Sequence, residues 1–149
     1  MLDQIKRLFE YDSWAIVRGL SVLNGVENPQ ALKTLAHILA AKEIWLVRLN
    51  GEDSSSIATS PELSYADCQS LAARLDAGYR QLISSLNEGS LTSSITYKNT
   101  KGEEFTTPIG EVLTHVAFHS AYHRGQMALL LRQNADAAIN TDFITFTRQ

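Results

Sequence analysis

Three histidines follow one another at intervals of four residues in the segment HVAFHSAYHRGQ, at His115, His119 and His123. On a helix, residues four positions apart lie on one face with Cβ atoms about 5–6 Å apart. Two imidazoles at that spacing can reach the same metal ion at about 2.0–2.1 Å. The spacing therefore indicates a site for a divalent metal ion, to which a second helix must add a third ligand.

Helical periodicity distinguishes among the three histidines, because each residue adds about 100° of rotation. Measured from His115, His119 falls near 40° and His123 near 80°. The apolar stripe of the same segment spans roughly 60° to 120°. Its members are Ile109, Val112, Val116, Met127 and Leu130. His119 and His123 are therefore the better ligand pair, and His115 either supports the site or faces solvent.

A second interpretation treats the paired histidines as hydrogen-bonded core residues. Each buried imidazole then needs partners for its ring nitrogens, and the same stripe carries no carboxylate to provide them. One cation would satisfy a nitrogen on both rings. The core interpretation stays open at this point, because the H-x-x-x-H spacing also arises on helices by chance.

Two further polar residues flank the paired histidines. Gln126 lies about 20° from His115, on the His119 side of the helix, and could orient a ligand from there. Arg124 could bind an anionic substrate, but a helix-surface or dimer-contact cation is the interpretation that its position favours.

No catalytic residue can be assigned from the sequence. Glu43 and Asp142 are the nearest candidates for a general base, although nothing places either beside the histidines. Tyr11 and Trp14 either wall a pocket or pack in the core. Cys68 is a poor nucleophile candidate, since it follows an aspartate and has no nearby histidine or cation to lower its pKa.

Apolar residues at three- to four-residue steps predict four long helices to carry these side chains. Their expected ranges are Leu2 to about Leu23, about Pro29 to Leu49, Ser64 to about Asn87, and Pro108 to about Gln133. Four helices of about twenty residues, joined by one tight turn and two longer connections, predict an all-α four-helix bundle.

The connections also carry recognisable signals. Ser64 with Asp67 three residues later resembles a capping box at the start of the third helix. The β-prone pieces SITYKN and EEFTT flank Thr100-Lys101-Gly102, which predicts a small hairpin or an extended loop before the last long helix. A short apolar tail, TDFITF, ends the chain.

Composition narrows the function classes. A chain of 149 residues, 44% hydrophobic and 19% charged, fits a single globular domain over residues 1–149. The net charge of −3 and the scattered basic residues argue against nucleic acid as a partner. No signal-peptide pattern and no long apolar run is present, so we expect a cytoplasmic protein with no membrane partner.

Taken together, the sequence resembles the DinB family, also described as DinB/YfiT-like metalloenzymes. The resemblance rests on HILAAKEIWLVRLNG around His37, on HVAFHSAYHRGQM, on YDSW in the first helix and on the terminal TDFITF. It implies a four-helix bundle with one divalent ion held by a histidine of the second helix and two of the last. The matching positions here are His37, His119 and His123, and the family also implies a homodimer.

The residues alone leave undecided the orientation of His37, the surroundings of the ligands and the identity of the metal. His37 lies nearly opposite the leucine stripe of its helix, so periodicity does not decide whether it faces the bundle. Phe118 and Ile16 stand where the family often has Asn, which affects the surroundings of the ligands but not the ligands themselves. The resemblance implies zinc or nickel as the ion. The imidazole ligands themselves suit iron and copper as well, and manganese is also possible.

Three neutral imidazoles leave at least one coordination position open, as in catalytic metal sites. We therefore expect a metal-dependent enzyme. It would be either a hydrolase or a transferase acting on a small-molecule thiol, like the bacillithiol transferases and mycothiol-dependent isomerases that are similar to this family. The alternatives are a non-catalytic, stress-associated dimer in which the ion is structural, and a plain bundle that acts through a partner surface.

Overall fold

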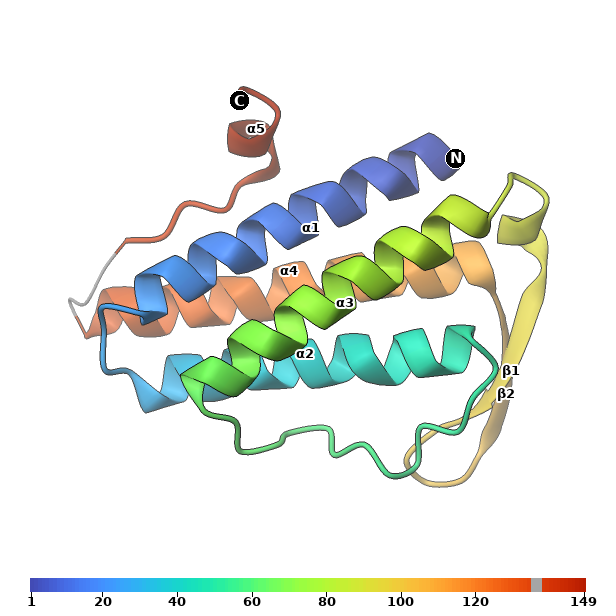
Figure 1. Ribbon diagram of the computed structural model, residues 1–149, viewed down its shortest axis with the longest axis horizontal. Helices are drawn as coiled ribbons and strands as arrows, with labels where there is room; N and C mark the ends of the chain where they lie inside the picture. The colour runs from blue at the N-terminus through green and yellow to red at the C-terminus, as the bar shows by residue number, and fades with distance from the viewer. Residues whose placement is uncertain (135–137) are drawn as a thin grey trace.

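A computed structural model describes residues 1–134 and 138–149 as a bundle of four long helices with a small hairpin at one end (Figure 1). The helices of the bundle are α1 (Leu2–Leu23), α2 (Pro29–Leu49), α3 (Tyr65–Ser85) and α4 (Ile109–Gln133). Between α3 and α4 lie a 3₁₀ turn, η1 (Ser90–Thr92), and strands β1 (Ser94–Lys98) and β2 (Glu104–Pro108). A short helix, α5 (Phe143–Phe146), lies in the tail. The prediction of an all-α bundle with a hairpin is confirmed.

Local sequence signals explain where two of the helices begin. The side chain of Asn28 accepts a hydrogen bond from the Ala31 amide, and Pro29 occupies the first position of α2, where its missing N–H costs nothing. At the start of α3, Ser64 and Asp67 exchange side-chain and backbone hydrogen bonds, so the predicted capping box is present.

Two glycines in the left-handed region mark the turns of the connections. Gly51 has a φ of 77° directly after α2, and Gly102 has a φ of 80° in the hairpin turn. Both conformations favour glycine because a Cβ would be strained there. The strands pair antiparallel, with Ile95 opposite Thr107. The third helix ends at Ser85, slightly earlier than expected, because the backbone of Leu86 is extended (φ −85°, ψ 153°).

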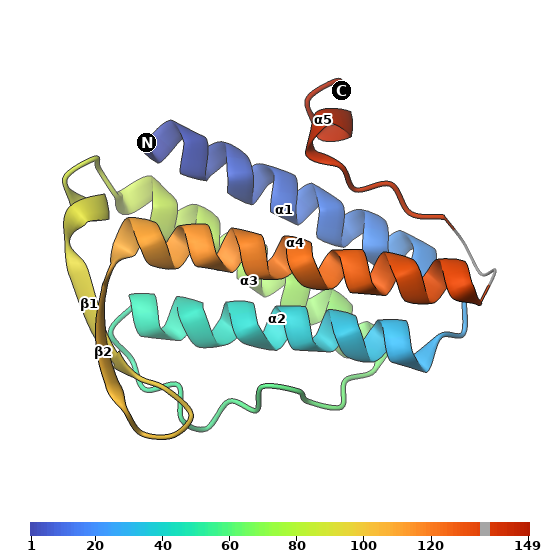
Figure 2. The same ribbon diagram turned by 180° about the vertical axis from the view of Figure 1, so that it is seen from behind.

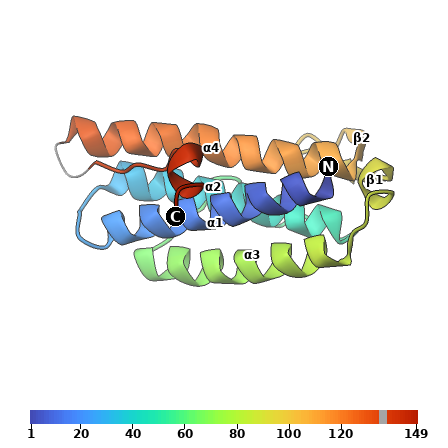
Figure 3. The same cartoon turned by 90° about the horizontal axis from the view of Figure 1, so that it is seen from above.

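Helices α2 and α4 run antiparallel beside each other and make the most extensive helix–helix contact of the bundle (Figures 1 and 2). Seen from above, α3 lies on the side of the bundle away from α4 (Figure 3). The α2–α4 seam therefore lies at one side of the molecule and is the place where side chains from the two helices meet.

The core consists of two apolar clusters, one in each half of the bundle. One cluster includes Ile16, Leu35, Leu39, Leu75, Met127 and Leu131. The other includes Ile5, Phe9, Tyr79, Ile83, Val112 and Val116. Each of α1, α2, α3 and α4 contributes apolar side chains to the core. Burial of these side chains stabilises the four helices against one another.

The apolar tail packs on α1. The Tyr11 ring lies 5.2 Å from that of Phe143, and the Trp14 ring lies 5.7 Å from that of Phe146. The Tyr11 hydroxyl also donates a hydrogen bond to the carbonyl of Thr141. Tyr11 and Trp14 of α1 therefore pack against the tail. Among the described residues, no helix is long and apolar enough to cross a membrane.

Candidate metal centre

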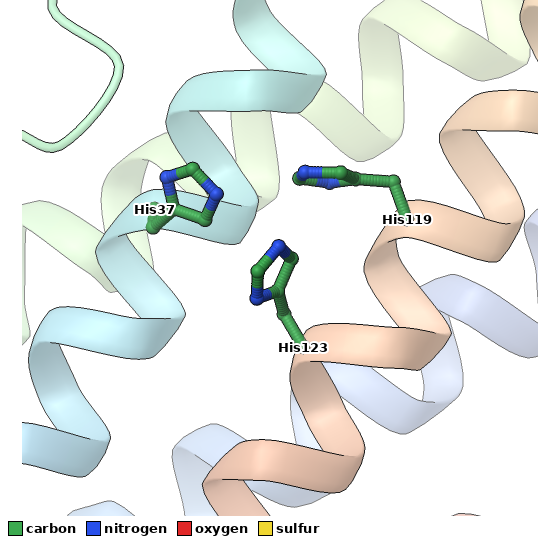
Figure 4. Close-up of side chains that lie close together, drawn as sticks. All are labelled: His37, His119 and His123. Carbon is green, nitrogen blue, oxygen red and sulfur yellow. The ribbon is translucent and has the colours of Figure 1, made fainter.

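Three imidazoles from two helices converge on one point of the α2–α4 seam. His37 projects from α2, and His119 and His123 project from successive turns of α4 (Figure 4). The ring centroid of His123 lies 4.4 Å from that of His119 and 4.5 Å from that of His37. One candidate ligand atom on each ring lies within 4.8 Å of the other two. All three side chains are half-buried.

Hydrogen bonds fix the tautomers of two of these rings. His37 Nδ1 lies 2.6 Å from the carbonyl oxygen of Thr59, in the loop that connects α2 to α3. His123 Nδ1 lies 2.7 Å from the side-chain oxygen of Gln126. Because both partners are acceptors, each Nδ1 must carry the proton and donate it. The lone pair of each ring is then on Nε2, where it can bind a metal ion.

The third ring is held in its neutral form by its surroundings. Burial lowers the pKa of His119 to about 4, and the neighbouring imidazoles of His123, His37 and His115 add to this shift. At neutral pH, His119 therefore has a free lone pair on its ring. A metal ligand needs such a neutral imidazole.

These features fit a single divalent ion. Ligand nitrogens bound to one tetrahedral ion lie about 3.3 Å apart, given bond lengths of about 2.0–2.1 Å. The three imidazoles are close enough to reach that spacing by small side-chain rotations, since their candidate atoms already lie within 4.8 Å. No carboxylate of the described residues joins the cluster. Its donor set of imidazoles is one that zinc, nickel, iron and copper accept.

The two residues expected to support the site occupy different positions. Gln126 contacts His123 directly, as described above. His115 lies outside the cluster, with its ring 5.7 Å from that of His119 and 5.4 Å from that of Trp45. Burial lowers the pKa of His115 as well, so it is a neutral aromatic neighbour of the site.

The preferred interpretation of Arg124 as a surface or dimer-contact cation is wrong. Arg124 is 2% exposed, and its Nη1 bonds both the carboxylate of Asp12 on α1 and, at 2.7 Å, the hydroxyl of Ser120. The other oxygen of Asp12 accepts a bond from the ammonium group of Lys42 on α2. One buried carboxylate thus joins two buried cations from the two helices that carry the histidines.

Electrostatics keep this network charged. Burial alone would raise the pKa of Asp12, but the charges of Lys42 and Arg124 outweigh it and hold the pKa below its ordinary value. The Nε and Nη2 atoms of Arg124 have no hydrogen-bond partner among the described residues, and its guanidinium lies over the Tyr11 ring, 5.0 Å from the centroid. A cation over a ring face is stabilised by the ring electrons.

Sequence reasoning missed this network, although a signal was present. Asp12 lies on the same stripe of α1 as Phe9 and Ile16, which are both buried. A charged residue on an apolar stripe must be paired, because an unpaired buried charge costs several kcal/mol or more. The same test applied to α2 would have selected Lys42, which follows Leu35 by seven residues on the leucine stripe. Arg124 falls near 180° from His115, outside the stripe of α4 that the sequence indicates, so periodicity would not have selected it.

The other polar candidates do not meet the histidines. Glu43 lies 3.6 Å from Arg74 of α3, and Asp142 directly precedes α5 in the tail. Burial, with a smaller effect from the charge of Asp67, raises the pKa of Cys68 to about 11, so its thiol stays protonated. A protonated, buried thiol is not a nucleophile.

Comparison with known proteins identifies the family to which this chain belongs. Residues 19–149 match the model of the DinB family, and this range includes all three converging histidines. The chain belongs to the DinB family. A curated relative, Protein DinB of Bacillus subtilis (strain 168), is 24% identical over 162 residues, covering 96% of this chain and 93% of the relative.

The fold is shared with a solved structure. A DinB-like protein from Bacillus cereus ATCC 10987, known from its crystal structure, is similar with a TM-score of 0.68 and 16% sequence identity. The similarity covers 93% of this chain and 95% of that one. At this identity the likeness concerns the DinB fold alone, and the chemistry has to be argued from the residues of this chain.

Proposed function

We propose that this DinB-family protein binds one divalent metal ion through His37, His119 and His123 and uses it in the transfer of a low-molecular-weight thiol. The observation that carries the proposal is the convergence of three imidazoles from α2 and α4. Zinc and nickel are the ions that we expect first.

The residues of the chain prepare the site in two ways. Thr59 and Gln126 accept the Nδ1 protons of His37 and His123 and so hold the rings with Nε2 available. The ligand set leaves at least one coordination position for a small molecule. A bound ion would lower the pKa of a thiol or a water molecule held at that position.

Thiol transfer is favoured over hydrolysis for a specific reason. Hydrolysis by a coordinated water usually involves a carboxylate or imidazole that moves its protons. No carboxylate of the described residues joins the histidine cluster, Glu43 is paired with Arg74, and the His115 ring lies outside the cluster, 5.7 Å from the ring of His119. A small thiol needs no such group, because it can lose its proton to solvent as it binds a metal ion. Metal-assisted hydrolysis remains the second enzymatic candidate.

A structural role for the ion is the main alternative. The histidines come from two helices, so an ion bound between them would cross-link α2 to α4. Such an ion stabilises the fold through binding to the native state alone. It would have no effect on the binding of small molecules.

The first experiment measures metal content on untagged protein supplied with zinc or nickel. We expect about one ion per chain in the wild type and loss of the ion in His119→Ala and in His123→Ala. His115→Ala is the matched control, since it removes an imidazole one turn away that lies outside the cluster; it should keep the ion. A wild type that binds neither metal contradicts the proposal.

A second experiment separates the two roles of the ion. The protein is loaded with cobalt(II) in place of the native ion and titrated with free cysteine as a simple thiol. Transfer chemistry predicts a new thiolate-to-cobalt absorption band that His123→Ala does not show. A purely structural ion predicts an increase in the thermal unfolding temperature on metal binding and no change in the spectrum with cysteine.

A further inference from the structure

A largely apolar groove lies between α1 and α3, away from the histidines. The two helices run antiparallel beside each other (Figures 1 and 3), and the cavity between them has a volume of about 640 Å³. Buried side chains of three helices form its floor, among them Phe9, Ile16, Leu39 and Tyr79. Among the described residues, none from α4 lines it. Cavities of this volume and apolar character bind small molecules.

The charged side chains of the groove gather in one half of it. The lining residues that carry a charge are Lys6 and Glu10 on α1, Lys42 on α2, and Asp76 and Arg80 on α3. The lining residues at positions 13–21 of α1 and 65–73 of α3 carry none. The Phe9 ring meets the Tyr79 ring at 4.7 Å in the charged half, and the Tyr65 hydroxyl bonds a carbonyl of α1 at the far end. The groove therefore has a charged half and an uncharged half.

A buried cation with donors to spare lies at the floor of the charged half. Lys42 is 6% exposed, and its ammonium lies 5.3 Å from the Phe9 centroid and 4.9 Å from the Tyr79 centroid. Among the described residues, this ammonium donates a hydrogen bond to Asp12 alone, whereas an ammonium has three N–H donors. Asp12 is also shared with Arg124, so two buried cations have one carboxylate between them. The floor of the groove thus carries an excess positive charge, which is costly away from water.

The acids that line the groove do not balance this charge. Asp76 is paired with Arg80 at 2.9 Å. Glu10 is exposed at the rim, where water and salt screen its charge. In the part of the chain that the structure describes, no ion pair joins either acid to Lys42. An anion from outside the chain is therefore the group that the floor of the groove would accept.

We propose that this groove binds a medium-chain fatty acid, with the carboxylate at Lys42 and the alkyl chain along the uncharged half. The carboxylate accepts the remaining N–H donors of Lys42 in charge-assisted hydrogen bonds and neutralises the excess charge. The alkyl chain covers the apolar walls, which include Ile16 and Leu20. From Ser13 to Ser21 the uncharged half extends about 12 Å along α1, and the extended chain of decanoate is comparable in length.

Calorimetric titration with decanoate below its micelle concentration tests the proposal, on untagged protein in EDTA. We expect one decanoate per chain, and affinity about fourfold higher for each methylene added from octanoate to decanoate. Decanol and decylammonium have the same chain with a neutral and a cationic head, and each should bind at least tenfold more weakly. Absence of decanoate binding, or equal binding of decylammonium, overturns the proposal. So does flotation with phosphatidylglycerol vesicles without binding of monomeric decanoate, which would show a membrane-lipid site instead.

The titration is repeated on His123→Ala to separate the groove from the histidine site. Because the groove and the histidines share no residue, this variant should bind decanoate as the wild type does. The result does not depend on whether the proposed metal function is correct. Loss of decanoate binding in His123→Ala would place the carboxylate at the histidines and overturn the proposal.

Two exposed alanines of α3 provide a matched pair that tests the position of the alkyl chain. Ala73 lines the uncharged half of the groove, and Ala77, one turn further along, does not line it. Ala73→Trp should fill the groove and weaken decanoate binding at least tenfold, whereas Ala77→Trp should bind as the wild type does. Equal affinities for the two variants overturn the proposed position.

Lys42→Met tests the position of the carboxylate, because it removes the excess charge and leaves Asp12 paired with Arg124. We expect this variant to lose the preference for decanoate over decanol and to bind decanol as the wild type does. A preserved preference would overturn the role of Lys42. Circular dichroism checks that the variant is folded, and if it is not, the comparison of head groups on the wild type and the alanine pair still decide the proposal.

Discussion

The histidines are oriented by partners of different kinds. His123 donates its Nδ1 proton to Gln126, three residues further along the same helix. His37 donates its own to a backbone carbonyl, Thr59, from a separate loop. A local side chain can be removed by substitution, whereas a backbone carbonyl cannot. Gln126 is therefore the residue at which the orientation of a ligand can be tested most directly.

We predict that Gln126→Ala weakens metal binding by about 10- to 100-fold, because the His123 ring loses the acceptor that fixes its tautomer. The affinity is measured by competition with a chromophoric chelator. Gln133→Ala, an exposed glutamine at the end of the same helix, serves as the control and should bind as the wild type does. Equal affinities for the two variants would show that Gln126 has no part in orienting His123.

At the level of single elements, the helices differ in how their ends are stabilised. Helix α3 begins with a complete capping box, in which Ser64 and Asp67 satisfy each other's backbone amides at 3.1 and 3.0 Å. Helix α1 has no side-chain cap at its N-terminus, where Glu88 accepts a hydrogen bond from the Leu2 amide instead. The start of α3 therefore depends on two neighbouring residues, and the start of α1 on a tertiary contact.

We predict that Ser64→Ala lowers the free energy of unfolding by about 1 kcal/mol, because the amide of Asp67 loses its acceptor. Urea denaturation monitored by circular dichroism gives this quantity. The control is Ser70→Ala within α3, where an exposed serine is replaced by a better helix former. It should be neutral or slightly stabilising, and a similar loss in both variants would contradict the capping role.

At the scale of the whole molecule, one carboxylate connects three helices. Asp12 of α1 pairs with Lys42 of α2 and with Arg124 of α4, and all three side chains are buried. Lys42 is five residues from His37, and Arg124 directly follows His123. The network therefore fixes how the two helices that carry the histidines lie relative to α1.

We predict that Asp12→Asn lowers the free energy of unfolding by about 3–5 kcal/mol, because it leaves Lys42 and Arg124 buried without their counter-ion. Denaturation by urea at pH 7 measures this loss. Asp3→Asn is the control, since Asp3 is 99% exposed and should change stability little.

The same variant should alter the dependence of stability on pH. The pKa of Asp12 in the folded protein lies below its ordinary value of 3.8, so ionised Asp12 contributes stability that is fully present well above that pH. The contribution is lost as the pH falls through the folded pKa. The wild type should therefore lose more stability than Asp12→Asn between pH 6 and pH 3, and parallel curves would contradict this assignment.

The sequence by itself determined the helices and part of the site. Helix ranges follow from local periodicity and from caps such as Ser64 with Asp67, because these signals involve residues within a few positions of one another. His119 and His123 could be selected as a pair for the same reason, since four residues on a helix set their separation. The orientation of His37 was left undecided by its own helix.

Tertiary structure decided what depends on residues far apart in the chain. The α2–α4 packing brings His37 to the histidines of α4, and Asp12 meets Arg124 although 112 positions separate them. Periodicity shows that a residue faces the core, but not which group it meets there. The buried partners of Arg124 therefore became visible only when the helices were placed together.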